Sequence, residues 1–128
     1  MPGSFNVEWL PGGVLLQTRT GTLTVPQAEQ YVAAVKLEVA KAPSPWGAVI
    51  DTRGAPAQSE EVQEVIQRLI KFVVANNVAR IAMVSTSAIT AMQQRRVTTA
   101  PGMHDPSTVS FHQDLDAAVA EVRNALAK

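Results

Sequence analysis

The sequence predicts an α/β domain with a mostly parallel sheet of about five strands, an N-terminal β-hairpin and four helices. Two segments rich in apolar residues flank the turn "PGG" at residues 11–13, which is the pattern of a hairpin. After residue 24, short apolar runs alternate with amphipathic segments, and this alternation favours parallel strands joined by right-handed crossovers. The 128 residues suit a single domain, which we expect to span 1–128.

Local signals mark the hairpin and the first helix. In "FNVEWL" the apolar side chains alternate and share one face, and "VLLQTRT" is typical of the returning strand. The helix begins after Thr24, whose side chain is a suitable cap, and Gln27 completes a capping box. Apolar residues then recur at helical spacing, at Val25, Ala28, Tyr31, Val32, Val35 and Val39. The prolines of "APSPWG" end this helix.

Three further strands alternate with three helices. The strands are the short apolar runs "WGAVIDT", "ARIAMVST" and "STVSF", and we expect their inner residues to be buried: Val49, Ile50, Ile81, Met83 and Val109. Helices are expected over about 59–76 and 87–98, ended by "NN" and "APG" respectively. The last helix, "DLDAAVAEVRNALAK", has an aspartate cap and one apolar side.

Composition and charge exclude several classes of function. The chain has no cysteine, so it has no disulfide, thiolate zinc site or cysteine nucleophile. Eleven basic residues balance eleven acidic ones without a basic stripe, so nucleic-acid binding is not expected. No stretch approaches the ~20 apolar residues of a membrane span, and "MPGSFNVEWL" lacks the pattern of a signal peptide. We therefore expect a cytoplasmic protein.

The element order and three local stretches resemble the SpoIIAA-like superfamily, which includes the STAS domains and is similar in fold to CRAL-TRIO lipid-transfer domains. The stretches are "WLPGGVLLQTRTGTLT", "WGAVIDTRG" and "HQDLDAAVAEV". Within the superfamily, the chain resembles small stand-alone bacterial STAS-like proteins over nearly its whole length. The resemblance implies a binding or regulatory module rather than an enzyme.

The resemblance also directs attention to Ser59. In anti-sigma factor antagonists, the loop after the central strand leads to Asp-Ser-Ser-Gly, and its second serine is phosphorylated to switch off partner binding. Counting without gaps from Asp51, that serine falls on Glu61, so the phosphorylatable motif is absent. Ser59 followed by two glutamates is typical of a plain N-cap. The alternative, a regulated serine, needs a slip of one or two residues in the alignment.

Four other polar residues follow neighbouring strands and are candidates for a ligand or partner site. Asp51 and Arg53 end the central strand, while Ser85 and Ser87 end the next one. Ligands of open α/β sheets gather at the carboxyl edge, so these side chains are candidates for one shallow polar site there. The alternative is that Asp51 holds the loop "TRGAP" through its backbone amides.

Catalytic and metal-binding motifs are missing. His104 and His112 are the only histidines, and two scattered histidines do not make a metal site. The sequence contains neither Gly-x-Ser-x-Gly nor a glycine-rich phosphate loop, so we expect no cofactor. An enzyme that uses Asp51 with Ser85 or His112 is a minor alternative to a module without catalytic activity.

The helix expected at 59–76 carries more apolar surface than one sheet face requires. Its apolar residues spread over an arc of roughly 200°, and the surplus falls on Ile70, Phe72 and Val74. An exposed apolar patch marks a contact, so these three residues are candidates for a homodimer or partner interface. The alternative is that a neighbouring helix of the same domain covers them.

Two functions follow from these observations. The first is a non-enzymatic regulatory or protein-interaction module of STAS-like type without the serine switch, acting on an unidentified protein partner. The second is a domain that binds a small apolar ligand or lipid, by analogy with CRAL-TRIO domains. The second is the alternative because 128 residues leave little room for a large cavity beside a packed core.

Overall fold

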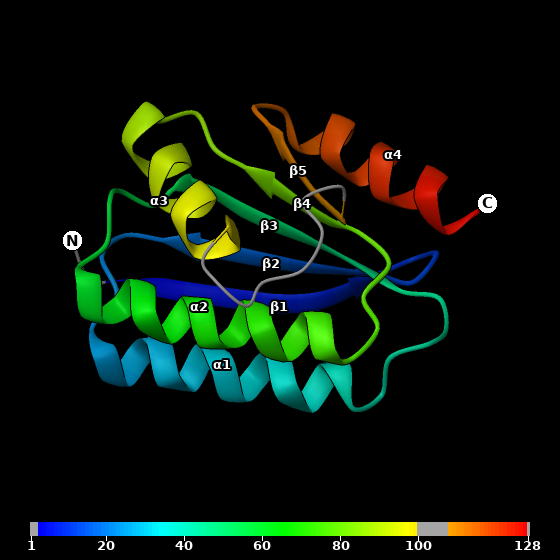
Figure 1. Ribbon diagram of the computed structural model, residues 1–128, viewed down its shortest axis with the longest axis horizontal. Helices are drawn as coiled ribbons and strands as arrows, with labels where there is room; N and C mark the ends of the chain where they lie inside the picture. Colours follow the sequence, from blue (N-terminus) through cyan, green and yellow to red (C-terminus); the bar gives the residue numbers. More distant parts are fainter. Residues whose placement is uncertain (1–2, 100–107, 128) are drawn as a thin grey trace.

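The computed structural model describes residues 3–99 and 108–127 (Figure 1). Its elements in chain order are β1 Ser4–Leu10, β2 Val14–Thr20, α1 Val25–Val39, β3 Gly47–Gly54, α2 Glu60–Ala75, β4 Ile81–Val84, α3 Ala88–Thr99, β5 Val109–His112 and α4 Leu115–Leu126. The strands form one sheet in the order β1-β2-β3-β4-β5, in which β1 is antiparallel to β2 and the other pairs are parallel. The predicted α/β class, hairpin and mostly parallel sheet are therefore confirmed.

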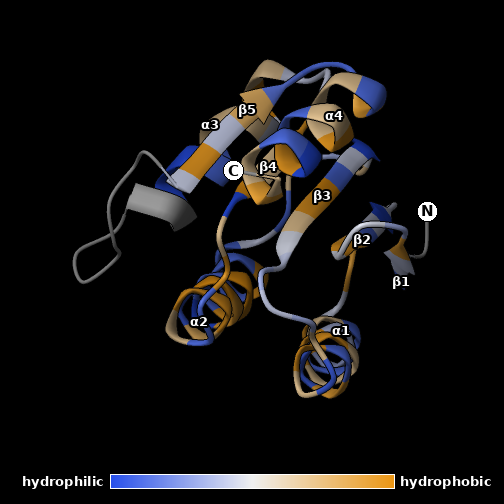
Figure 2. Cartoon of the chain, turned by 90° about the vertical axis from the view of Figure 1, so that its right-hand side faces the viewer, coloured by the Kyte–Doolittle hydropathy of each residue, from blue (hydrophilic) through white to orange (hydrophobic). Residues whose placement is uncertain are grey.

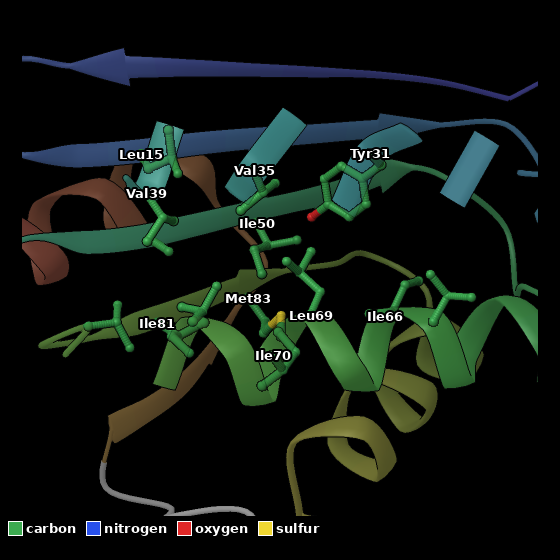
Figure 3. Packing of buried hydrophobic residues seen from close by; sticks show 14 of the residues in the cluster. Leu15, Tyr31, Val35, Val39, Ile50, Ile66, Leu69, Ile70, Ile81 and Met83 are labelled. Atoms are coloured by element: carbon green, nitrogen blue, oxygen red, sulfur yellow. The ribbon is translucent and has the colours of Figure 1, made fainter. Parts of the chain in front are cut away.

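Helices cover both faces of the sheet. Seen nearly end-on in Figure 2, α1 and α2 lie on one side of the sheet and α4 on the other. The α1–α2 side holds the larger core, in which Leu15, Ile50 and Met83 pack against Tyr31 and Leu69 (Figure 3). The α4 side holds a smaller cluster of strand residues around two helix residues, Ala118 and Val122. Because β3 is covered on both faces, its first six residues are all buried.

Burial of the strand residues follows their place in the sheet. Val49, Ile50, Ile81 and Met83 are buried, as predicted. Val109 is only half-buried, so the prediction for that residue is wrong. The reason is that β5 is an edge strand, which has a neighbouring strand on one side only.

Caps fix the helix starts at the residues that the sequence indicates. The Thr24 hydroxyl accepts a hydrogen bond from the Gln27 amide at 3.2 Å, and the Gln27 side chain accepts one from the Thr24 amide at 2.9 Å. Ser59 and Asp114 cap α2 and α4 in the same way, by accepting from the amides of Val62 and Ala117. No helix in the described part of the chain is both long and apolar enough to cross a membrane.

The surplus apolar side of α2 is largely covered by its neighbours. Ile70 is only 1% exposed and lies beside Leu69 and Met83 (Figure 3), so its proposal as an interface residue is wrong. For Ile70 the alternative is correct, in which neighbouring elements of the same domain cover the wide apolar arc of α2. Phe72 and Val74 are half-buried against the same core, and the Lys36 ammonium lies 5.1 Å from the Phe72 ring centre.

We expect Ile70→Ala to reduce the free energy of unfolding by about 2–5 kcal/mol, because it leaves a cavity in a closely packed core. Val74→Ala is the matched control and should cost clearly less, since Val74 is only half-buried. Urea unfolding followed by circular dichroism measures both values. Equal losses in the two variants would contradict the buried position of Ile70.

Candidate functional site at the carboxyl edge of the sheet

The sheet face beneath α1 and α2 changes from apolar to polar toward its carboxyl edge. Strand residues alternate between faces, so the next residues on this face lie two positions beyond Leu15 and Ile50. The residues at these positions are polar. Gln17 and Arg19 continue β2, and Thr52 continues β3. All three are buried, with exposed fractions of 1%, 5% and 2% respectively. A polar layer therefore lies inside the fold where the parallel strands end.

Hydrogen bonds from glutamine side chains hold the β3–α2 loop in place over this polar layer. The Gln58 amide donates to Gln93 Oε1 at 2.8 Å, and Gln93 Nε2 donates to the Gln58 carbonyl at 3.0 Å. Gln58 Oε1 accepts from the Leu23 amide at 2.9 Å, and its Nε2 donates to the carbonyls of Gly21 and Pro56. The loop is thus tied to α3 and to the segment between β2 and α1.

A small pocket lies between this loop, α2 and α3. Its volume is about 30 Å³, and its lining residues are Arg19, Thr52, Ala55, Pro56, Gln58, Gln63, Ile66, Thr90, Gln93 and Gln94. Gln94 Nε2 donates to Thr52 Oγ1 at 2.8 Å, and Thr52 Oγ1 donates to the Val84 carbonyl at 2.8 Å. Thr90 Oγ1 donates to the Ala55 carbonyl at 3.4 Å. The inner side of α3 is therefore attached to the sheet and loop mainly through polar groups.

Asp51 and Arg53 form a closed pair on the other face of the sheet. Arg53 Nε and Nη2 donate to the two carboxylate oxygens of Asp51 at 2.9 Å each, and the Arg53 amide donates to Asp51 Oδ1 at 3.1 Å. Burial acts to raise the pKa of Asp51, but its hydrogen bonds with Arg53 and the charge of Arg53 outweigh it and lower the pKa. The backbone contact to Arg53 agrees with the alternative in which Asp51 holds its own loop.

Ser85 and Ser87 turn the chain from β4 into α3. Ser85 Oγ accepts from the Ser87 amide at 3.2 Å, and Ser87 Oγ accepts from the Thr90 amide at 3.3 Å. Both serines line a surface pocket of about 480 Å³ together with residues of α3 and β5. Asp51 instead follows Val49 of the α4-side cluster at a spacing of two residues, so it faces α4. The four candidates share an edge of the sheet but do not assemble into one site.

A polar cluster that the sequence did not indicate lies between β4, β5 and α4. Glu121 accepts hydrogen bonds from the Arg80 guanidinium and from Ser110 Oγ, the latter at 2.8 Å, and its carboxylate also contacts His112 Nε2. Ser110 Oγ also lies 2.9 Å from His112 Nε2. A serine triad needs the serine and the acid on different ring nitrogens of the histidine, whereas here both contact Nε2. The geometry therefore differs from that of a serine hydrolase.

Of the two histidines in the sequence, His104 lies outside the described residues. Across residues 3–99 and 108–127, no group of three or more histidine, aspartate or glutamate side chains is arranged to hold a metal ion. The buried Gln17 and Arg19 were missed, although their alternation with Leu15 in "LLQTRT" places them on the core face of β2.

Comparison with solved structures identifies the class of fold. An anti-sigma factor antagonist from Mycobacterium paratuberculosis superposes with a TM-score of 0.70 at 17% identity, covering 94% of each chain. An uncharacterized protein of the DUF3478 family with a SpoIIAA-like fold, from Shewanella loihica, gives a TM-score of 0.66 at 18% identity, covering 94% of this chain and 93% of that chain. No protein-family model and no curated protein matches the sequence. The chain has a SpoIIAA-like fold, as the sequence predicted.

We expect Ser59→Ala to cost about 0.5–2 kcal/mol of stability, because it removes the hydroxyl that accepts from the Val62 amide. Ser59→Asp is the matched control, since aspartate caps as well as serine. Thermal and urea unfolding give both values. If Ser59→Ala is as stable as the wild type, the cap does not contribute as described.

We expect Glu121→Gln to destabilise the protein at neutral pH. Burial acts to raise the pKa of Glu121, but hydrogen bonds from Arg80 and Ser110 and the charges of Arg80 and His112 outweigh it and lower the pKa. A carboxyl with a lowered pKa in the folded state stabilises the fold above its unfolded pKa of about 4.3, and this contribution is lost as pH falls through the folded pKa. The stability difference between wild type and variant should therefore shrink in acid.

Urea unfolding at about pH 7 and about pH 3 measures this difference on either side of the ordinary glutamate pKa. Glu64→Gln is the control, because Glu64 is exposed and forms no ion pair with any described residue. A loss that is the same at both pH values would show that the carboxylate charge of Glu121 is not responsible.

Proposed function

We propose that the chain is a regulatory protein-interaction module of STAS-like type, which binds a protein partner without catalysing a reaction and without an Asp-Ser-Ser-Gly switch. The fold that it shares with an anti-sigma factor antagonist supports this class of function. The position equivalent to the switch serine carries Glu61, and Ser59 is engaged as the cap of α2. The setting that we propose for this interaction is the cytoplasm.

The observation that carries the proposal is an exposed apolar side of α3. Ile89 is 62% exposed and Met92 is 64% exposed, and their spacing of three residues places them on one side of the helix. Arg96 is exposed one further turn along, and among the described residues it has no ion-pair partner. The opposite side of α3, with Thr90 and Gln94, is buried. Large apolar side chains gathered on an exposed surface are typical of protein contacts.

The chemistry of this surface defines its partner. Ile89 and Met92 suit an apolar segment of another protein, and Arg96 suits an acidic residue beside that segment. The adjoining Gln93 ties α3 to the β3–α2 loop, so the surface is held in a fixed place relative to that loop. Phe72 and Val74, which are partly buried against the core, remain a second candidate patch on α2.

The alternative, a small apolar ligand or lipid, has less support. The pocket beside α2 and α3 has a volume of only about 30 Å³. Sites for small organic ligands are typically about 300–1,000 Å³ and mainly apolar. The pocket of about 480 Å³ beside α3 reaches that size, but serine, threonine, glutamine, arginine and histidine form much of its wall.

Site-specific photo-crosslinking in cells tests the proposed surface. A photoreactive phenylalanine analogue at position 92 should crosslink a defined protein, whereas the same analogue at Leu37, an exposed apolar residue of α1, should not. Adding Ile89→Glu should remove the crosslink while the thermal stability stays unchanged, because Ile89 is exposed. A crosslink to a second copy of the chain would identify a homodimer instead. Equal crosslinking from positions 92 and 37 would refute the surface.

A further inference from the structure

Arg19 carries a buried positive charge without a negative partner. Its side chain is on β2 and the residue is only 5% exposed. Within residues 3–99 and 108–127, Arg19 forms no ion pair, and its Nε has no hydrogen-bond acceptor. A guanidinium stays protonated in proteins, and a buried charge is costly unless an opposite charge or strong acceptors compensate it. Among the described residues, none supplies an acceptor for this Nε donor or a negative charge for the guanidinium.

The contact of Arg19 with an aromatic ring does not supply a hydrogen-bond acceptor for Nε. The guanidinium carbon lies 5.5 Å from the centre of the Tyr31 ring, a cation–π distance. Burial raises the pKa of Tyr31, which outweighs the lowering effect of the Arg19 charge, so the phenol stays neutral. Its hydroxyl donates to Gln17 Oε1, which leaves Gln17 Nε2 without an acceptor. Two unsatisfied donors thus lie two residues apart on the same face of β2.

Arg19 also lines the pocket between the β3–α2 loop, α2 and α3. The described lining residues are neutral apart from Arg19, and they include the hydroxyl and amide side chains of Thr52, Gln63 and Gln94. The volume of about 30 Å³ accommodates on the order of two water molecules. A carboxylate is about that size and has two acceptor oxygens in one plane, and the planar guanidinium fork matches its geometry.

We propose that this pocket binds the carboxylate of a small organic acid, with Arg19 as its anchoring residue. The pocket walls formed by Ala55, Pro56 and Ile66 accept a short apolar portion of the acid, and the volume excludes nucleotides and long acyl chains. This site is separate from the exposed side of α3, because Arg19 faces the inner side of that helix. The Ile89→Glu variant should therefore bind the acid as the wild type does.

Acetate is the probe, and thermal unfolding is the first measurement. Acetate replacing chloride at constant ionic strength should raise Tm in a saturable way, since a ligand that binds only the folded state stabilises it. Acetamide, the neutral analogue of the same shape, should have no such effect. Arg19→Met should weaken acetate binding by at least about tenfold, the loss expected when a charge-assisted hydrogen bond is removed. Arg68→Met, which removes an exposed arginine, should respond like the wild type.

A second measurement covers the case in which Arg19→Met does not fold. In the wild-type protein, the Nε–Hε nuclear magnetic resonance signal of Arg19 should shift with acetate concentration and saturate. Arg19→Lys assigns that signal by its disappearance. A signal that does not move, an equal response to acetamide, or an effect of acetate no greater than that of chloride would overturn the proposal. Any of these results would show that water alone satisfies Arg19.

Discussion

The central constraint in this fold is the enclosure of β3 between two layers of helices. Its residues alternate between the core under α1 and α2 and the core under α4, and six consecutive positions are buried. The layers approach so closely that a Cβ built on Gly47 would lie 2.4 Å from Val122 Cγ1 of α4. Glycine therefore fits best at the start of β3, because a Cβ there would force the Val122 side chain or α4 to shift.

The enclosure of β3 restricts polar side chains to the end of the strand. A polar side chain in the middle of β3 would be buried without solvent on either face, and the central positions there are apolar. At the carboxyl end, the next residues find polar partners within β3 and on α3. Asp51 turns back to Arg53 on the α4 side, while Thr52 bonds Gln94 on the α2–α3 side. Adjacent residues of one strand thus serve two unrelated polar environments.

The sequence was most informative where structure depends on neighbours along the chain. The hairpin, the alternation of strands and helices, and the caps at Thr24, Ser59 and Asp114 are local patterns, and each has its physical cause within a few residues. Burial of Ile70 depends on packing between separate elements, and the exposure of Val109 depends on the order of strands in the sheet. Neither can be read from a single segment.

The candidate site likewise combines features that depend on local sequence with features that depend on packing between separate elements. The sequence indicated that four polar residues end two neighbouring strands. In the structure Asp51 and Arg53 lie in β3, whereas Ser85 and Ser87 lie in the turn after β4, and Asp51 and Ser85 have different surroundings. The two-residue repeat of a strand also places Gln17 and Arg19 on the core face of β2. A buried arginine, however, contradicts the ordinary rule that charges stay exposed. A departure of this kind from the rules of folding is expected at functional positions, since stability alone does not explain it.

The attachment of α3 links the two surfaces that these observations define. Its inner side meets the sheet and the β3–α2 loop through Thr90, Gln93 and Gln94, whereas α2 is held by a continuous apolar face. Each net hydrogen bond stabilises by only about 0.5–1.5 kcal/mol, so α3 is held less firmly than a helix with a full apolar stripe. The acid that we propose beside Arg19 would touch the inner side of α3, and the proposed protein partner on Ile89 and Met92 would touch its outer side. A shift in the position of α3 would then affect both surfaces, which is the physical requirement for coupling between two binding events.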